Sequence, residues 1–191
     1  MIAGGFGVGK TTAVGAVSDI TPLSTEEYLT EPSTGVDSLK GIEAKQTTTV
    51  AFDFGRTSLP DAPFPLELYL FGTPGQDRFG DLWYELSRGA VGAIVLVDTR
   101  RLQSSFAPVD FFEDIQLPFA IAVNEFDGAE RHHPEEVRDA LGLPTSVPVL
   151  TCDARDPDHV AGVLLALVGH AASTAPTAPT PASSAITLQD A

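Results

Sequence analysis

The residues GGFGVGKT, at positions 4–11, give the strongest indication of the fold, because they have the G-x-x-x-x-G-K-T spacing of a Walker A phosphate-binding loop. Its glycines allow the backbone to turn successive amides inward, as a nest of donors around phosphate oxygens. The ammonium of Lys10 would lie against the β- and γ-phosphates, and the hydroxyl of Thr11 would bind Mg²⁺. Such a loop requires a strand before it and a helix after it, and we expect that order here.

The sequence on both sides of the loop is consistent with that order. Ala13, Val14, Val17 and Ile20 follow at helical spacing. Only residues 1–3 precede the loop, whereas a buried strand normally has about five or six residues. We expect this strand to be central, and either the natural protein begins upstream of Met1 or the strand is a stub. The residues of this region predicted to contact nucleotide are Gly5, Phe6, Gly7, Val8, Gly9, Lys10, Thr11 and Thr12.

Composition limits the classes of partner. The chain has 191 residues, enough for one domain and a tail, and a formal net charge of -15. This charge disfavours nucleic acid and anionic membrane surfaces and favours a basic protein partner. The single cysteine, Cys152, excludes an internal disulfide and favours a reducing compartment, so the cytoplasm is the expected location. No apolar run is long enough to insert into a membrane, and we expect any membrane association to occur through a partner.

The remaining chain alternates between strands and helices. Residues 21–46 are polar and interrupted by proline, which predicts a long loop that senses the nucleotide. Residues 47–59 and 66–71 have the composition of two strands, and their short connection makes them antiparallel. Strands are also predicted within 90–98, 117–124 and 146–154, and helices around 82–86, 104–114, 134–141 and 157–171. The helix within 104–114 is expected to be short and broken near Pro108.

This order of elements predicts an α/β domain of the P-loop NTPase class over residues 1–171. We expect a mostly parallel six-stranded sheet, with one antiparallel hairpin strand and helices on both faces. Residues 172–191 are rich in proline, threonine and alanine, which predicts a disordered tail. Ligands of such sheets bind beyond the carboxyl ends of the strands, where the loops of interest lie.

Five short motifs carry a family resemblance. In order they read GGFGVGKT (4–11), TVAFDF (49–54), GTPGQDRF (72–79), NEFD (124–127) and CDAR (152–155). Together they resemble the guanine-nucleotide signatures of Ras-like small GTPases, over almost the whole chain before the tail. The variants are most similar to the bacterial GTPases of conservon-type operons, whose partners include a roadblock-fold protein. The polarity GTPase of gliding bacteria is a more distant resemblance.

The resemblance implies roles for the residues of the central motifs. Thr49 would bind Mg²⁺ through its hydroxyl and the γ-phosphate through its amide, and Gly75 would sense the same phosphate. Gln76 would orient the attacking water, unless it is a solvated loop residue. Arg78, the only cation near this loop in the sequence, is expected to act in the site or to pair with Asp77 at the surface.

The last two motifs would recognise the base. A carboxylate at Asp127 accepts the N1 and N2 protons of guanine, and adenine has no such donor pair on that edge. This contrast favours GTP and GDP over ATP. Asn124 would brace the phosphate loop, although N-x-x-D-G is also ordinary turn chemistry. The amide of Ala154, after Asp153, would donate to guanine O6.

Two positions depart from the pattern. Gly72 stands where relatives have an aspartate that holds Mg²⁺ through water, so the metal site lacks a carboxylate. Asp53 on the neighbouring strand is the candidate replacement, with a solvent-facing hairpin residue as the equal alternative. Glu125 replaces the lysine that would lie along the base, which predicts modest affinity.

Other conspicuous groups have simpler explanations. His132 and His133 are expected to be solvated loop residues rather than metal ligands. Cys152 is expected to be a buried, inert thiol. The aromatic residues expected in the core or an interface are Trp83, Phe111, Phe112 and Phe119.

The leading functional prediction is a small GTPase for signal transduction, with GTP, GDP and Mg²⁺ as cofactors and slow, partner-assisted hydrolysis. A nucleotide-binding scaffold without effective hydrolysis is the alternative. A small-molecule phosphoryl transferase ranks last, because residues 21–46 contain no arginine for a phosphate-clamping lid.

Overall fold

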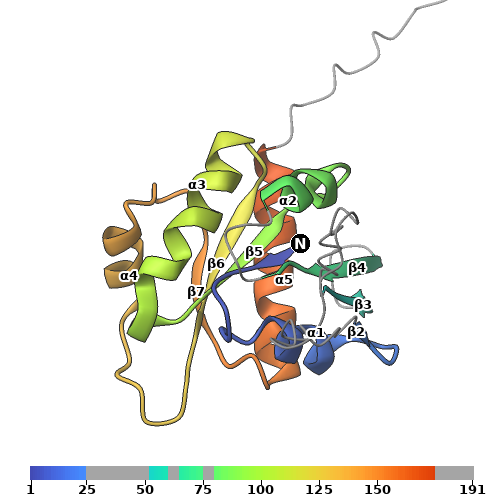
Figure 1. The fold of residues 1–191 in the computed structure, drawn as a ribbon, viewed down its shortest axis with the longest axis horizontal. Coiled ribbons are helices and arrows are strands. Elements are labelled where there is room, and N and C mark those ends of the chain that lie inside the picture. Colours follow the sequence, from blue (N-terminus) through green and yellow to red (C-terminus); the bar gives the residue numbers. More distant parts are fainter. Residues whose placement is uncertain (25–51, 60–64, 75–79, 175–191) are drawn as a thin grey trace, which may run out of the picture.

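The computed structural model describes residues 1–24, 52–59, 65–74 and 80–174. Within them, one sheet has the strand order β2-β3-β4-β1-β5-β6-β7 (Figure 1). The strands are β1 (Ile2–Ala3), β2 (Leu23–Ser24), β3 (Asp53–Leu59), β4 (Leu66–Gly72), β5 (Ala93–Val97), β6 (Phe119–Asn124) and β7 (Val149–Cys152). The helices are α1 (Lys10–Val17), α2 (Gly80–Ser87), the 3-10 helix η2 (Thr99–Ser105), α3 (Phe106–Asp114), α4 (Pro134–Leu141) and α5 (Pro157–Thr174).

The pairing of the strands confirms the predicted α/β fold. β3 runs antiparallel to both of its neighbours, β2 and β4, whereas the pairs from β4 through β1 and β5 to β7 are parallel. The six expected strands are present, and the described part of the chain adds β2 at the start of the segment predicted to be a loop. With only two residues, β2 is too short to produce a recognisable alternation.

The short first strand occupies the centre of the sheet, as predicted. Ile2 pairs with Gly72 of β4 and with Ile94 of β5. Every residue of β5 and β6 is buried, which explains why both appear in the sequence as continuous apolar runs. The central position of β1 places the start of the phosphate loop between these buried strands and β4.

Helices cover the sheet on two sides (Figure 1). One apolar cluster joins the sheet to α1 and α5 through residues such as Val14 and Leu164. The other joins it to α3 and α4 through Phe112 and Val137, with α2 adding Trp83 against Phe112. Trp83, Phe112 and Phe119 are buried, and Phe111 packs against the second cluster, so the predicted core role of these aromatic residues is confirmed.

Three local predictions are corrected. Pro108 does not break a helix, because it lies in the first turn of α3, where its missing N–H has no intrahelical partner to lose. Ile20 lies outside α1, which ends at Val17 before an extended Ser18. His133 is not merely solvated: its Nδ1 accepts from the N–H of Glu135 and caps α4.

The last helix is longer than predicted. α5 continues to Thr174, three residues beyond the predicted helix end at 171. Residues 172–174, predicted as the start of the tail, therefore belong to α5, and the rest of the predicted tail lies outside the described residues. Cys152 is buried, and burial raises the pKa of its thiol to about 11, as expected for an inert cysteine. No helix in the described ranges is both long and apolar enough to cross a membrane.

Candidate nucleotide-binding site

The phosphate loop connects β1 to α1, which is the predicted succession of strand, loop and helix. Gly9 is the N-cap of α1 and has φ 105°, a left-handed conformation that side chains rarely adopt. A Cβ at Gly9 would also lie only 2.8 Å from Nδ2 of Asn124. Gly4, with φ 137°, is similarly restricted, because a Cβ there would lie 2.4 Å from the carbonyl oxygen of Leu96. Both glycines are therefore required by the close packing of the loop.

Lys10 is held against the loop by its own backbone. Its Nζ donates to the carbonyl oxygens of Gly4 and Gly5, both at 2.8 Å. Burial lowers the pKa of Lys10 to about 8, and the negative charge of Asp53 opposes this shift. The ammonium is thus charged at neutral pH and fixed beside the loop that a phosphate would enter.

Asp53 lies beside Thr11, although they are 42 residues apart in the sequence. The Thr11 hydroxyl donates to Oδ2 of Asp53 at 2.6 Å. Asp53 pairs with Gly72 across the β3–β4 hairpin, and a Cβ at Gly72 would lie 3.1 Å from Oδ2 of Asp53. The Asp53 carboxylate is therefore adjacent to the position that lacks the expected aspartate. Of the two alternatives left open for Asp53, the solvent-facing one is wrong, since the residue is buried.

A hydroxyl and a carboxylate are the oxygen ligands that Mg²⁺ prefers, and this ion commonly keeps several waters besides one or two protein ligands. The pair formed by Thr11 and Asp53 fits such a site. Among the described residues, no group of three or more His, Cys, Asp or Glu side chains forms a metal cage. Thr49, the third predicted ligand, lies outside the described residues.

Asn124 joins the phosphate loop to the loop after β7. Its Nδ2 donates to the carbonyl oxygen of Val8 at 2.9 Å, and its Oδ1 accepts from the N–H of Ala154 at 2.9 Å. Asn124 is buried at the end of β6 and braces the loop, rather than being an ordinary turn residue. The N–H of Ala154, which was predicted to donate to guanine O6, donates here to Asn124, and its role toward a base stays a prediction.

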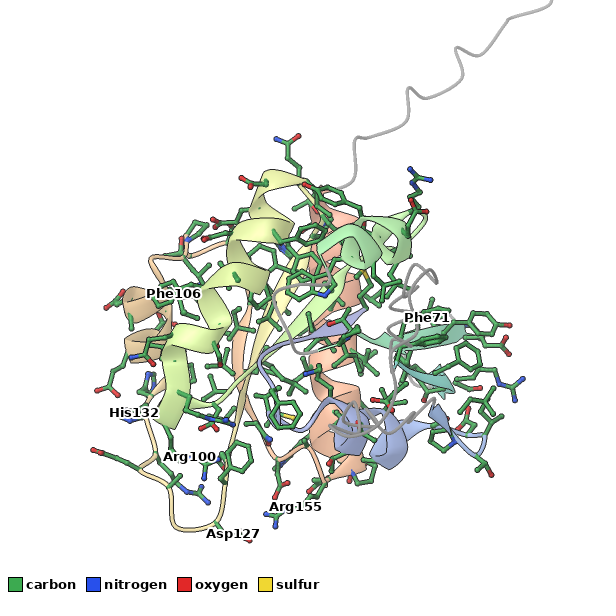
Figure 2. The ribbon with its side chains drawn as sticks, in the orientation of Figure 1. Phe71, Arg100, Phe106, Asp127, His132 and Arg155 are labelled. Carbon is green, nitrogen blue, oxygen red and sulfur yellow. The ribbon has the colours of Figure 1, made fainter. Side chains whose placement is uncertain are left out.

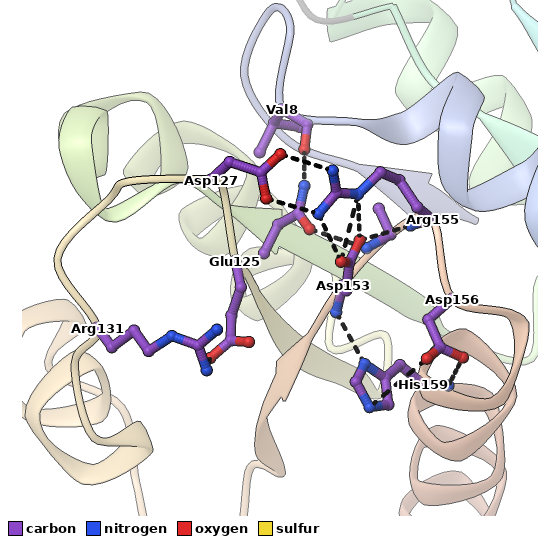
Figure 3. A network of polar contacts seen from close by, with 10 residues as sticks. Val8, Glu125, Asp127, Arg131, Asp153, Arg155, Asp156 and His159 are labelled. Atoms are coloured by element: carbon purple, nitrogen blue, oxygen red, sulfur yellow. Dashed lines mark hydrogen bonds and ion pairs between the residues drawn. The ribbon is translucent and has the colours of Figure 1, made fainter.

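Asp127 extends from the loop after β6 and meets Arg155 from the loop after β7 (Figure 3). The two carboxylate oxygens of Asp127 accept from Nη1 and Nη2 of Arg155 at 2.9 and 3.1 Å. Asp153 also accepts from Arg155, through Nη2 at 2.7 Å and Nε at 2.9 Å. Arg155 lowers the pKa of Asp127, and it lowers that of Asp153 to about 2. Both carboxylates are therefore ionised at any physiological pH.

A buried carboxylate after β5 organises two further arginines. Asp98 is 1% exposed and accepts from Arg100 and Arg101 at distances of 2.8 to 3.3 Å. Arg101 also donates to the carbonyl oxygen of Phe6 in the phosphate loop at 3.1 Å, and the Arg100 guanidinium lies 3.9 Å from the ring centre of Phe126. Hydrogen bonds to Arg100, which outweigh burial, lower the pKa of Asp98. This cluster connects the phosphate loop to the loop that carries Asp127.

A family model described as a conserved hypothetical ATP binding protein matches residues 2–174. The match covers most of the chain, from β1 to the end of α5. The chain belongs to this family. It is therefore a nucleotide-binding P-loop protein, in agreement with the phosphate loop. No curated protein matches the chain. The narrower resemblance to conservon-type GTPases stays a prediction.

Two of the predicted site residues, Phe6 and Thr12, are exposed. Phe6 of the phosphate loop is 73% exposed, and Thr12 is exposed in α1. Glu125, which replaces the expected lysine, pairs with Arg131 at 3.0 Å.

Figure 2 shows Arg100, Asp127 and Arg155 at the same end of the molecule, away from Phe71 of β4. Gly75, Gln76 and Arg78 of the central motif lie outside the described residues.

The sequence interpretation missed Arg100 and Arg101. It named Arg78 as the nearby cation, whereas the structure brings Arg101 to the phosphate loop. The available signal was the sequence Asp98-Thr99-Arg100-Arg101 directly after a buried strand, because the carboxyl ends of neighbouring parallel strands share one edge of the sheet. The contact of Arg155 with Asp127 was also missed.

Proposed function

We propose that this chain is a GTP-binding regulatory protein, a small GTPase that cycles between GTP and GDP states with slow, partner-assisted hydrolysis. The observation that carries the proposal is the brace formed by Asn124. By binding Val8 and Ala154 at once, it fixes the N-x-x-D loop beside the phosphate loop. A nucleotide whose phosphates occupy the nest then has its base near Asp127.

Guanine fits this arrangement better than adenine, although the family description names ATP. The carboxylate of Asp127 is ionised and acceptor-only, so it needs a base edge with donors. Guanine presents N1–H and N2–H together, whereas adenine presents an unprotonated N1 to the same oxygens. The side chain of Asp127 is 85% exposed and pairs with Arg155 at the surface, so its carboxylate is accessible to a base.

Chemistry at the phosphate end would use few residues. Thr11 and Asp53, with Thr49, would hold Mg²⁺, which neutralises charge on the β- and γ-phosphates when it is bound. Lys10 adds a fixed positive charge, Gly75 would sense the γ-phosphate, and Gln76 would orient water. We propose that a regulatory protein, of the roadblock type or another product of the same operon type, completes this site.

Titration of the purified chain with labelled GDP, GTP and ATP, with and without Mg²⁺, tests the proposal. We expect Asp127→Ala to weaken GDP and GTP binding but not ATP binding. Lys10→Ala should weaken all three, because it removes charge from the shared phosphate site. Tighter binding of ATP than of GTP by the unmodified chain would contradict the guanine assignment.

A nucleotide-binding scaffold without effective hydrolysis is the second candidate. Gly72 favours it, because the carboxylate that Ras-like proteins have at that position is missing. Single-turnover hydrolysis of GTP, with and without candidate partner proteins, separates the two. Phosphate release in any of these conditions supports the GTPase, and its absence in all of them supports the scaffold.

A further inference from the structure

The base-recognition carboxylate is already occupied by a side chain of the same protein. Arg155 donates to both oxygens of Asp127 through its two terminal nitrogens, at 2.9 and 3.1 Å (Figure 3). This is a bidentate contact between a planar guanidinium and a carboxylate, the strongest form of such a pair. Both acceptor atoms that guanine would use are thus engaged.

The donor pattern of Arg155 copies that of guanine. The two terminal nitrogens of a guanidinium present parallel N–H bonds in one plane. The N1–H and N2–H bonds of guanine have the same arrangement, because N1, C2 and N2 of the base form a guanidine-like unit. Asp127 can therefore form an equivalent pair of hydrogen bonds with either group, but the two cannot use the same oxygen positions at once.

Asp153 keeps Arg155 in place when Asp127 is released. It accepts from Nε at 2.9 Å and from Nη2 at 2.7 Å, and it also accepts from the backbone N–H of Arg155 at 2.9 Å. Without its contact to Asp127, the Arg155 guanidinium would remain paired with Asp153. The guanidinium would stay close to the base site, at a high effective concentration for returning to Asp127.

We propose that Arg155 is an internal competitor of the nucleotide base for Asp127, and that it thereby sets the affinity and release rate of guanine nucleotides. The inference rests on the proposed function, in which Asp127 reads guanine. A base that enters must first break the contact between Arg155 and Asp127. The loss of that contact offsets part of the free energy that the base gains from Asp127. A base that leaves is replaced at once by Arg155, which favours release.

The variant Arg155→Gln tests the competition. It removes the cation and the bidentate donor pair but keeps a polar side chain at an exposed position. We expect the dissociation constant of labelled GDP to fall about 2- to 5-fold, the size expected for an exposed ion pair, and GDP release to slow. The inhibition constant of tripolyphosphate should stay unchanged, because tripolyphosphate does not reach Asp127. It is obtained from displacement of labelled GDP, corrected for the GDP affinity of each variant.

Two controls isolate the contact. Arg88→Gln removes the same charge from an exposed pair outside the site, Arg88 with Glu85, which does not touch Asp127. It should leave GDP affinity unchanged. In the Asp127→Ala background, Arg155→Gln should no longer improve GDP binding, since the competed carboxylate is gone. Thermal unfolding of each variant confirms that it is folded.

The outcomes separate the two proposals. Weaker or unchanged GDP binding by Arg155→Gln would overturn the competition, as would an equal gain from Arg88→Gln or a gain that persists without Asp127. The proposed function fails on a different measurement, namely if the unmodified chain binds ADP as tightly as GDP. The GDP affinity of Arg155→Gln therefore tests the competition, and the preference of the unmodified chain for GDP over ADP tests the base assignment.

Discussion

Lys10 is the buried cation of the phosphate loop, and its pKa near 8 makes phosphate binding sensitive to pH. Phosphates favour the charged ammonium, so bound nucleotide raises the pKa of Lys10 and affinity falls as pH rises above the pKa of the free protein. From pH 7 to pH 9 the charged fraction drops from about nine-tenths to about one-tenth, so we expect GDP affinity to fall about tenfold. Fluorescence titration of labelled GDP across this range provides the measurement.

Lys10→Gln is the reference for that titration. It should bind GDP weakly at every pH from 7 to 9, without the loss of affinity seen in the unmodified chain. A flat profile for the unmodified chain would show that the charge of Lys10 does not limit binding.

Asp53 should matter for the metal rather than for the fold. Asp53→Ala removes the carboxylate that accepts from Thr11, and we expect the magnesium affinity of the GDP complex to fall about 10- to 100-fold. The measurement is GDP release as a function of free Mg²⁺. Asp19→Ala is the matched control, because Asp19 accepts from the N–H of Ser58 on the same hairpin without contacting Thr11. An equal loss in both variants would exclude a specific metal role.

At the scale of elements, two pairings build the site. The β3–β4 register sets Asp53 opposite Gly72, and packing of α1 against α5 fixes the helix that begins at the phosphate loop. α5 has an apolar stripe toward the sheet and an outer face toward solvent. Leu164 is 3% exposed on that stripe, whereas Leu165 is 37% exposed.

These two neighbouring leucines give a paired test of α5. Leu164→Ala creates a cavity against the sheet and should lower the free energy of unfolding by about 2–5 kcal/mol. Leu165→Ala should lower it by less than about 1 kcal/mol. Urea denaturation followed by circular dichroism measures both. Equal losses would mean that α5 does not pack through this stripe.

At the scale of the whole molecule, the loops that form the site converge from different strands. The phosphate loop follows β1, Asp98 follows β5, Asn124 ends β6 and Asp153 follows β7. All of these strands are parallel, so their carboxyl ends meet at one edge of the sheet. A bound nucleotide would therefore contact most of the sheet through these loops.

Binding should stabilise the entire domain. At a GDP concentration about 100 times the dissociation constant, linkage adds about 2.7 kcal/mol of stability. For a chain of this size we expect the melting temperature to rise by about 5 to 10 °C. Differential scanning fluorimetry measures the shift, and Lys10→Ala at the same GDP concentration should show a smaller one. No shift for the unmodified chain would argue against a nucleotide site.

Much of the fold and part of the site followed from local sequence patterns. The glycine spacing of residues 4–11 predicted the phosphate loop, and alternation or continuous apolar runs predicted β3 to β7 in order. These features depend on backbone conformation and on burial, both of which act over a few neighbouring residues. The position of Asn124 at the end of a buried strand was predictable for the same reason.

Local sequence was sufficient to predict the phosphate loop, the α/β order and the candidate base motif, because short-range geometry and hydrophobicity encode them. Three contacts could be learned only from the folded chain: Asp53 with Thr11, Arg101 with the phosphate loop, and Arg155 with Asp127. Arg101 and Phe6 are far apart in the chain, and no local pattern specifies which donor meets which acceptor. Strand register and the packing of loops at one edge of the sheet bring these charges together.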